Sequence, residues 1–304
     1  MKCRTCGLKA AVNMRHHKLA LCKDHFLSWM PGQVDRFIKK YQMFSREDRI
    51  LIAVSGGKDS LALWEILSEL GYITEGIYIN LGIEPGGGYS EVSLEKVNEF
   101  THKRDLKLHV ISIYEEFGES ILDISQRVRR GKNSVCSVCG LTKRHLLNKY
   151  AREHDYDILV TGHNLDDEAA TLFGNTLHWN GEFLLRQNPV LEASKGFIRK
   201  TKPLCRIYER DIAAYALLKE IDYIYEECPF STGSTSIYYK RQLNHLEHNR
   251  PGEKLRFYVH FLKAKEDGLF SPLQNIQQNL HPCPECGQPT SAPDLCSFCR
   301  MMDH

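Results

Sequence analysis

The stretch "LIAVSGGKDS", residues 51–60, decides the fold that this 304-residue sequence predicts. Its first four residues are apolar and complete a short buried strand over 49–54. The chain then passes through Gly56 and Gly57 into a helical pattern over 60–71. Two adjacent glycines allow a sharp bend and a close approach of the backbone to an anion. A strand that turns through glycines into a helix start therefore predicts a phosphate-binding loop.

The polar residues of this loop strengthen the prediction. Ser55 and Ser60 supply hydroxyl donors, and Lys58 supplies a full positive charge beside the favourable end of the helix dipole. Asp59 could bind the Mg²⁺ that accompanies a polyphosphate. The loop has neither the Walker spacing of glycines and lysine nor the dinucleotide fingerprint. The sequence therefore favours a nucleotide bound by a different kind of phosphate loop.

Segments with strand and helix patterns alternate after the loop. Strands are expected at 74–80, 106–113 and 156–162, and helices at 89–105, 137–155, 166–179 and 209–221. This alternation predicts βαβ units and an α/β fold with a parallel sheet, which binds ligands at the carboxyl ends of its strands. A last strand is expected at 222–227, followed by helices at 236–249 and 253–266.

Cysteines mark both ends of the chain. The first group is Cys3, Cys6, Cys22 and His25, and the last group is Cys283, Cys286, Cys296 and Cys299. Each group contains two pairs with x-x spacing, and each pair places two ligands on one tight turn, so that two turns complete a zinc tetrahedron. We predict one structural zinc ion at each end. The predicted segments are a zinc finger (1–30), a linker helix opened by Pro31 (31–48), the nucleotide-binding domain (49–230), a helical segment (231–275) and a zinc ribbon (276–304).

The overall composition narrows the class of protein. The net charge of +2 creates no global field that demands a polyanionic partner. The sequence has no apolar run of about 18 residues, which predicts no membrane span, and its first residues lack the apolar region of a signal peptide. These features favour the cytoplasm, where thiols stay reduced. Eleven cysteines in such a compartment indicate metal binding or chemistry.

Four cysteines lie outside the two terminal groups. Cys205 lies in an apolar strand-to-helix segment and is expected in the core. Cys136 and Cys139 form a central Cys-x-x-Cys, and Cys228 precedes a proline in a polar loop. A Cys-Pro step ends some iron–sulfur ligand runs. The residues alone leave a third zinc site, a dithiol pair and an iron–sulfur site open, with Cys136, Cys139 and Cys228 as the provisional set.

Six motifs together resemble a known family. "AVSGGKDS" (53–60) resembles the pyrophosphate (PP) loop of N-type ATP pyrophosphatases, which adenylate a substrate, and "TGHNLDDEA" (161–169) resembles the second signature of the tRNA-thiolating branch. The order of the cysteine groups and these two loops is similar to that of the TtuA-type tRNA 2-thiouridine synthetases across nearly the whole chain. The resemblance implies a PP-loop α/β core, similar to adenine nucleotide α-hydrolases, between two zinc modules.

The resemblance also implies roles for individual residues. Residues expected to bind ATP and Mg²⁺ are Ala53, Val54, Ser55, Gly56, Gly57, Lys58, Asp59, Ser60, Ile79 and Gly162. Cys136, Cys139 and Cys228 are expected to hold a [4Fe–4S] cluster, one iron of which lacks a protein ligand and could hold sulfide. Lys143 and Asp167 match reaction-centre residues: Lys143 would offset phosphate charge, and Asp167 would move a proton or orient the base.

The implied reaction transfers AMP to the uracil O2 of a tRNA uridine, with T-loop position 54 favoured over the wobble base, and then replaces that oxygen with sulfur. The implied partners are tRNA, a ubiquitin-like sulfur carrier with a C-terminal thiocarboxylate, and a second copy of the chain. Basic residues support contact with RNA phosphates. They form one run without acids, Arg127, Arg129, Arg130, Lys132, Lys143, Arg144, Lys149 and Arg152, and a second run, Lys195, Arg199, Lys200, Lys202 and Arg206.

Two alternatives remain at this point. In the first, Cys139 and Cys228 carry sulfur as a persulfide or disulfide pair without a cluster. In the second, the protein is a zinc- and iron-containing RNA-binding redox sensor whose ATP site is vestigial. The intact loops at 55–60 and 162–167 disfavour the second alternative.

Overall fold

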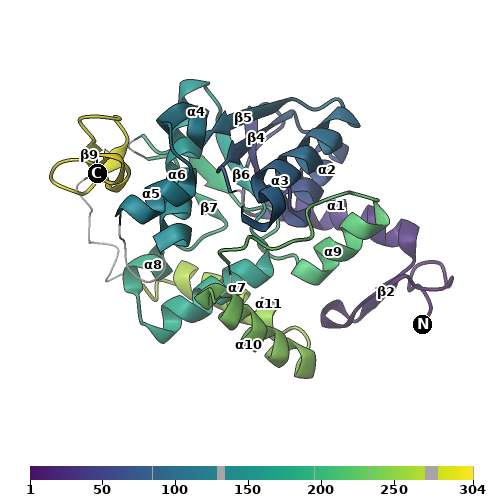
Figure 1. The fold of residues 1–304 in the computed structure, drawn as a ribbon. Coiled ribbons are helices and arrows are strands. Elements are labelled where there is room, and N and C mark those ends of the chain that lie inside the picture. The colour runs from purple at the N-terminus through teal and green to yellow at the C-terminus, as the bar shows by residue number, and fades with distance from the viewer. Residues whose placement is uncertain (84, 129–133, 195, 232, 271–279, 304) are drawn as a thin grey trace.

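A six-stranded sheet lies at the centre of the computed structural model, with the strand order β5-β4-β3-β6-β8-β7 (Figure 1). Neighbouring strands are parallel, except that β7 is antiparallel to β8. The structure describes the chain apart from residues 84, 129–133, 195, 232, 271–279 and 304. The strands are β3 (Ile50–Val54), β4 (Thr74–Asn80), β5 (Leu108–Ser112), β6 (Ile158–Thr161), β7 (Val190–Leu191) and β8 (Arg199–Thr201).

The predicted parallel α/β fold is confirmed, and two details of the sheet differ from the prediction. Residues 222–227 do not form a strand. Ile224 instead donates one backbone hydrogen bond to Gly56 O, at 2.9 Å, and the segment lies against the phosphate loop. The sheet is extended by β8 and β7, which were missed because they have only three and two residues.

The connectivity places a crevice beside β3. From β3 the chain moves outward through β4 to β5, and it then returns to the other side of β3 to form β6. The strand order therefore reverses between β3 and β6, and the loops that follow these two strands diverge around that point. Ligands of open α/β sheets bind in such crevices. Both sequence signatures, 55–60 and 162–167, lie in the two loops concerned.

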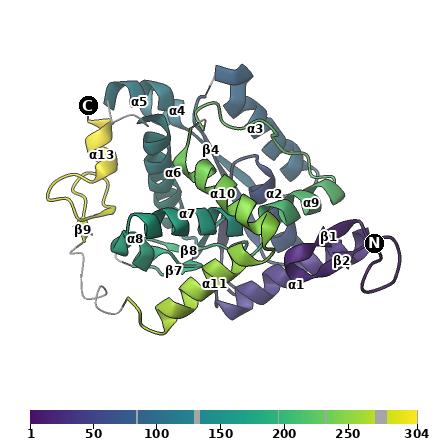
Figure 2. The same cartoon turned by 90° about the horizontal axis from the view of Figure 1, so that it is seen from below.

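Helices cover both faces of the sheet (Figures 1 and 2). One core contains residues of α1, α2, α9 and α11, and the other contains residues of α5, α6 and the C-terminal module. The helices are α1 (Lys23–Lys40), α2 (Lys58–Glu69), α3 (Pro85–His102), α4 (Ile113–Phe117), α5 (Ile121–Val128), α6 (Ser134–Glu153), α7 (Leu165–Leu177), α8 (Gly181–Arg186), α9 (Glu209–Leu218), α10 (Thr235–Asn249) and α11 (Glu253–Glu266).

Helix α1 begins at Lys23, and the prediction that Pro31 opens a linker helix is wrong. Cys22 is the N-cap, and the backbone N–H of Phe26 donates to Cys22 O at 2.9 Å. Pro31 lies inside the helix, where it removes one helical hydrogen bond. The buried face of α1, with Phe26, Met30 and Val34 fully enclosed, stabilises the helix across this position. The first cysteine group and α1 therefore share residues.

Small modules occupy the two ends of the chain, on opposite sides of the core in both views (Figures 1 and 2). The N-terminal module contains β1 (Val12–Met14), the 3₁₀ turn η1 (Arg15–His17) and β2 (Leu19–Leu21). The C-terminal module contains β9 (His281–Pro282), β10 (Pro289–Thr290) and α13 (Ser297–Met302). Among the described residues, the helices are all too short or too polar to cross a membrane.

Candidate functional site

The phosphate loop joins β3 to α2 through a backbone conformation that requires glycine. Gly56 has φ = +76°, and a Cβ at this position would lie 2.6 Å from Ser93 O. Gly57 is the N-cap of α2 in an extended conformation. The Ser60 hydroxyl donates to Gly57 O at 3.1 Å and accepts from Ser55 N at 3.2 Å. The loop is therefore fixed by its own hydroxyl groups, and it presents the N-terminal N–H groups of α2.

The second signature follows β6 and packs directly on the start of α2. A Cβ on Gly162 would lie 3.0 Å from Ser60 N. This close contact explains the glycine by backbone packing, whereas its predicted contact with the nucleotide stays a prediction. Asn164 is the N-cap of α7: its side chain accepts from Asp166 N and Asp167 N, and Asp167 Oδ2 accepts from Asn164 N at 3.0 Å. The two sequence signatures therefore lie side by side.

Six side chains from both signatures and two further helices form a closed ring. Asn164 Nδ2 donates to Asp59 Oδ1 at 3.1 Å, and Lys58 Nζ lies 3.1 Å from Asp59 Oδ2. Lys58 Nζ also lies 2.7 Å from Glu209 Oε1. Lys240 Nζ lies 3.3 Å from Glu209 Oε2 and 2.6 Å from Asp167 Oδ1. The ring closes where Asp167 Oδ2 accepts a hydrogen bond from the backbone N–H of Asn164.

The charges of the ring shift the ionisation of its members. Burial raises the pKa of Asp59, an effect that Lys58 only partly offsets. Burial also opposes ionisation of Asp167, but Lys240 and His163 outweigh it and lower the pKa of this carboxyl group. Glu209 behaves in the same way, because Lys240 and Lys58 overcome its burial and lower its pKa.

Asn164, Glu209 and Lys240 were missed by sequence reasoning. Glu209 starts α9 and Lys240 lies in α10, both of which have ordinary helical patterns. Asp166 does not cap α7. It is buried and accepts from Lys254 Nζ at 2.5 Å and from Glu209 N at 3.0 Å. The carboxylate at 166 thus fixes the start of α9, which brings Glu209 into the ring.

The predicted adenosine-binding residues lie at the carboxyl ends of β3 and β4. Ala53 and Ile79 belong to the core on the α6 side of the sheet, whereas Val54 packs in the opposite core. The side chain of Val54 therefore lies on the opposite face of the sheet from that of Ala53. Contact of these three residues with adenosine stays a prediction.

An open cavity of about 560 Å³ lies beyond Lys58. Its wall combines the N-terminal module, the start of α9 and the α10–α11 turn. The residues that line it include Arg15, Lys58, Asp166, Glu209, Arg210 and Lys254. Lys58 of the phosphate loop and Glu209 therefore lie in the wall of this cavity.

Cys136 and Cys139 lie in the first turns of α6, and Cys228 comes close to them from the loop after α9. The Cys136 thiol donates to Phe230 O at 3.3 Å, two residues beyond Cys228. Burial raises the pKa of Cys139, Lys143 opposes this shift, and Cys228 and Cys136 reinforce it, so these groups lie within electrostatic reach of one another. Burial likewise raises the pKa of Cys136, and the nearby Cys228 raises it further.

The assignment of these three thiols to a cluster stays a prediction. Within the part of the chain that the structure describes, the three thiols are not among the groups whose ligand atoms all lie within 4.8 Å of one another. Each cysteine of an iron–sulfur cluster binds a different iron, so its sulfurs lie farther apart than the ligands of one metal ion. Cys205 is fully buried elsewhere in the core, and burial raises its pKa to about 12. The prediction that Cys205 is a core residue is confirmed.

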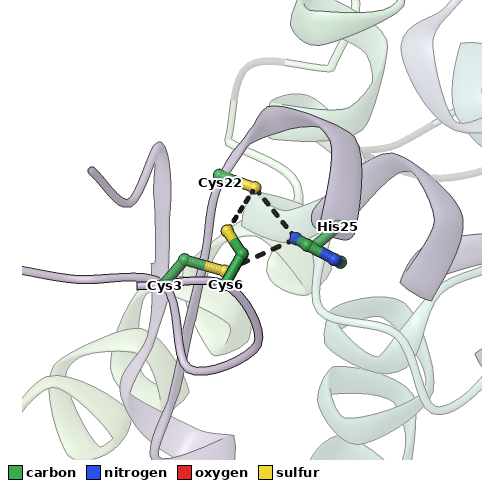
Figure 3. Close-up of side chains that lie close together, drawn as sticks. All are labelled: Cys3, Cys6, Cys22 and His25. Atoms are coloured by element: carbon green, nitrogen blue, oxygen red, sulfur yellow. Dashed lines mark hydrogen bonds between the residues drawn. The ribbon is translucent and has the colours of Figure 1, made fainter. Parts of the chain in front are cut away.

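The N-terminal cysteine group brings four ligand side chains close together (Figure 3). The ligand atoms of Cys3, Cys6, Cys22 and His25 all lie within 4.8 Å of one another. Cys6 Sγ and Cys22 Sγ are 3.8 Å apart, and His25 Nδ1 lies 3.7 Å from Cys3 Sγ. A zinc–sulfur bond of about 2.3 Å gives a tetrahedral S···S edge of about 3.8 Å. The residues present therefore fit zinc.

The C-terminal group has the same geometry and is attached to α6. Cys283, Cys286, Cys296 and Cys299 form the second set within 4.8 Å, and Cys286 Sγ lies 3.7 Å from Cys296 Sγ. Phe298 stacks on His145 of α6, with ring centroids 3.7 Å apart and an interplanar angle of 10°. Gln288 donates to His145 O at 3.0 Å and accepts from Asn148 at 3.1 Å. The second module thus packs against the helix that carries Cys136, Cys139 and Lys143.

The second predicted basic run is largely occupied by contacts within the protein. Arg199 contacts Glu192 at 3.0 Å, Lys202 pairs with the buried Glu168 at 2.7 Å, and Arg206 lies over the ring of Phe37. These three side chains are therefore engaged in the fold. Lys200 differs, because burial and the neighbouring Arg144 lower its pKa to about 8. Four other residues of the two runs, 129, 130, 132 and 195, lie outside the described residues.

A parallel sheet whose central strand ends in a Ser-Gly-Gly-Lys-Asp-Ser loop defines the class of PP-loop nucleotide-binding proteins. The PP-loop domain family matches residues 30–242, and the N-terminal LIM domain of the 2-thiouridine synthetase TtuA matches residues 2–27. The chain belongs to the TtuA family of tRNA sulfurtransferases within that class.

Similar proteins match over almost their full lengths. The chain is 45% identical to the tRNA-5-methyluridine(54) 2-sulfurtransferase of Thermotoga maritima, covering 99% of this chain and 96% of that protein. It is 43% identical to the protein of the same name from Thermus thermophilus, covering 100% and 91%. Among solved structures, the U34-tRNA thiolase NcsA of Methanococcus maripaludis with its [4Fe–4S] cluster is similar, with a TM-score of 0.82, 25% identity and coverage of 100% and 96%.

Proposed function

We propose that this protein is an ATP-dependent tRNA sulfurtransferase that converts the uridine base at position 54 of tRNA to its 2-thio form. The main support for this proposal is the 45% identity, over nearly the full length of both chains, to a sulfurtransferase named for position 54. Identity to the thiolase named for U34 is 25%. The difference favours the T-loop position over the wobble base.

The ring and the phosphate loop support an adenylation step. The uracil O2 attacks the α-phosphorus of ATP, pyrophosphate leaves, and the oxygen becomes part of an AMP leaving group. Sulfide then attacks C2, and AMP departs with the former O2. Residues 55–60 would bind the triphosphate, with Asp59 near Mg²⁺ and Ala53, Val54, Ile79 and Gly162 around the nucleotide. Lys143 would offset charge on the phosphate in the transition state.

Asp167 would orient the base or move a proton at the uracil, in a position where its carboxylate stays ionised. Cys136, Cys139 and Cys228 would hold a [4Fe–4S] cluster, which supplies a binding place for sulfide when it is present. The two terminal donor sets would hold structural zinc ions. Further parts of the proposal are a cytoplasmic location, a homodimer, and a ubiquitin-like carrier whose C-terminal thiocarboxylate delivers the sulfur.

The test uses anaerobically purified protein with ATP, Mg²⁺, sulfide and a tRNA transcript, followed by nucleoside mass spectrometry. AMP and one 2-thiouridine per tRNA are expected, and both are expected to disappear with a transcript that carries cytidine at position 54. Thiolation that persists in this transcript and maps to the wobble base would reject the favoured target. Absence of both AMP and thiouridine would favour an RNA-binding role.

A further inference from the structure

We propose that Glu209 and Lys240 are positioning residues of the nucleotide site. In this assignment Lys240 holds Asp167, and Glu209 keeps Lys240 at a fixed distance from Lys58. The inference rests on the proposed function, because it concerns the reaction in which Asp167 takes part. Neither residue lies in the two loop signatures that carry the family resemblance.

The contacts place the pair between the two signatures. Glu209 uses one carboxylate oxygen for Lys58, at 2.7 Å, and the other for Lys240, at 3.3 Å. Lys240 then reaches Asp167 at 2.6 Å. The two residues come from α9 and α10, so they join the phosphate loop to the start of α7 through side chains alone. A change at either residue opens the ring.

The ion pair between Lys240 and Asp167 is partly buried, and both side chains keep some exposure to the site. The side chains of Lys240 and Asp167 are 23% and 29% exposed. Opposite charges in such a partly buried setting interact more strongly than a solvent-exposed pair, which contributes little. Each lysine of the ring contacts two carboxylates, so each of the two ammonium groups has its position defined from two sides.

Lys240 would also offset the repulsion between a bound triphosphate and the Glu209 carboxylate. A phosphate at the loop would compete for Lys58 and would repel the Glu209 carboxylate beside it. Lys240 compensates Glu209 from the opposite side, which allows this carboxylate to remain near the phosphate. The same ammonium group then keeps Asp167 ionised at the uracil side of the site. Lys240 thereby couples the binding of ATP at the phosphate loop to the ionisation of Asp167.

The ionisation of Asp167 gives a readout that a loss of folding would not produce. The charged and titratable groups that face Asp167 are Lys240 from α10, His163 from the loop after β6, Asp59 from α2 and Glu209 from α9. Burial raises the pKa of Asp167, whereas Lys240 lowers it most, followed by His163 and the backbone N–H of Asn164. The two neighbouring carboxylates oppose its ionisation. Removal of Lys240 therefore raises this pKa, and the acidic limb of the activity profile is expected to move to higher pH.

The experiment measures kcat, KM for ATP and the pH profile of tRNA thiolation with the anaerobically purified full-length enzyme. Lys240→Met is expected to lower kcat by about a hundredfold, because small displacements of a catalytic group have effects of that size. Its acidic limb moves to higher pH, and Lys240→Arg restores most of the rate and the original limb. Arg241→Met, at the exposed next position of α10, is the matched control and is expected to leave all three measurements unchanged.

Glu209→Gln tests the other half of the pair. Because Glu209 and Lys240 contact each other in the same ring, the losses in the double variant Glu209→Gln/Lys240→Met are expected to be less than additive. Additive losses, or a Lys240→Met variant with wild-type rate and pH profile, would overturn the assignment. A slow Lys240→Met variant with an unmoved limb would also overturn it, by indicating a purely structural role. A wild-type enzyme that makes no thiouridine contradicts the proposed function instead.

Discussion

His16 Nε2 lies 2.8 Å from Asp211 Oδ2, and both side chains are almost fully buried, at 3% and 2% exposed. The His16 ring also packs on Tyr208, with centroids 3.8 Å apart. His16 belongs to the N-terminal module, whereas Tyr208 and Asp211 lie at the start of α9, beside Glu209. The contact therefore fixes the N-terminal module to the helix that supplies the ring with a carboxylate.

We expect His16→Ala to destabilise the protein by about 3 kcal/mol, because it removes the 2.8 Å hydrogen-bond partner of a buried carboxylate. Urea denaturation measures the free energy of unfolding. Arg15→Ala, at the exposed neighbouring position, serves as the control and is expected to change stability little. Equal stabilities of the His16 variant and the wild type would show that the contact does not fix the module.

The two loop glycines are expected to respond differently to alanine. Gly56→Ala combines a left-handed backbone with a Cβ placed 2.6 Å from Ser93 O, so a loss of about 2 kcal/mol or more is expected. Gly57 has φ = −83°, and its added Cβ would meet only the Ser55 hydroxyl, at 3.6 Å. Gly57→Ala should therefore fold with nearly wild-type stability. Urea midpoints compare the two variants, and similar midpoints would contradict the described loop geometry.

Iron analysis tests the cysteine centre. Anaerobically purified protein is expected to contain about four iron atoms per chain. Cys228→Ala should lose this iron, whereas Cys205→Ala should retain it, because Cys205 is enclosed in the hydrophobic core. An iron-free preparation with full thiolation activity would instead support sulfur transfer through Cys139 and Cys228.

Zinc analysis tests the two terminal donor sets independently. Wild-type protein is expected to bind about two zinc ions per chain, and Cys6→Ser and Cys286→Ser are each expected to reduce the content to about one. Each variant is the control for the other, since its second site is intact. If either variant kept both ions, the corresponding four-ligand set would be wrong.

The features that sequence reasoning predicted well depend on neighbours along the chain. The bend at Gly56, the paired ligands of the terminal groups and the strand of β4 all arise from short segments with distinctive residue types. The burial of Cys205 followed from its apolar surroundings in the sequence. Local chemistry was sufficient in each of these cases.

The features that were missed depend on contacts between distant segments. Glu209 and Lys240 look like any charged residues on helix surfaces, and their meeting is set by how α9 and α10 pack. The segment 222–227 has a strand-like pattern but lies beside the phosphate loop instead of at a sheet edge. Lys202 looked free to bind RNA, yet it neutralises the buried Glu168.

The position of Cys22 and His25 in the first turn of α1 has a consequence for how the protein folds. Forming the first turn is the unfavourable step of helix formation. A metal ion held by residues three apart would fix that turn before the rest of α1 is in place. Since α1 packs on α2 and α9, which form two sides of the nucleotide site, we expect metal uptake at the N-terminus to act as a folding nucleus for the ATP-binding half of the molecule.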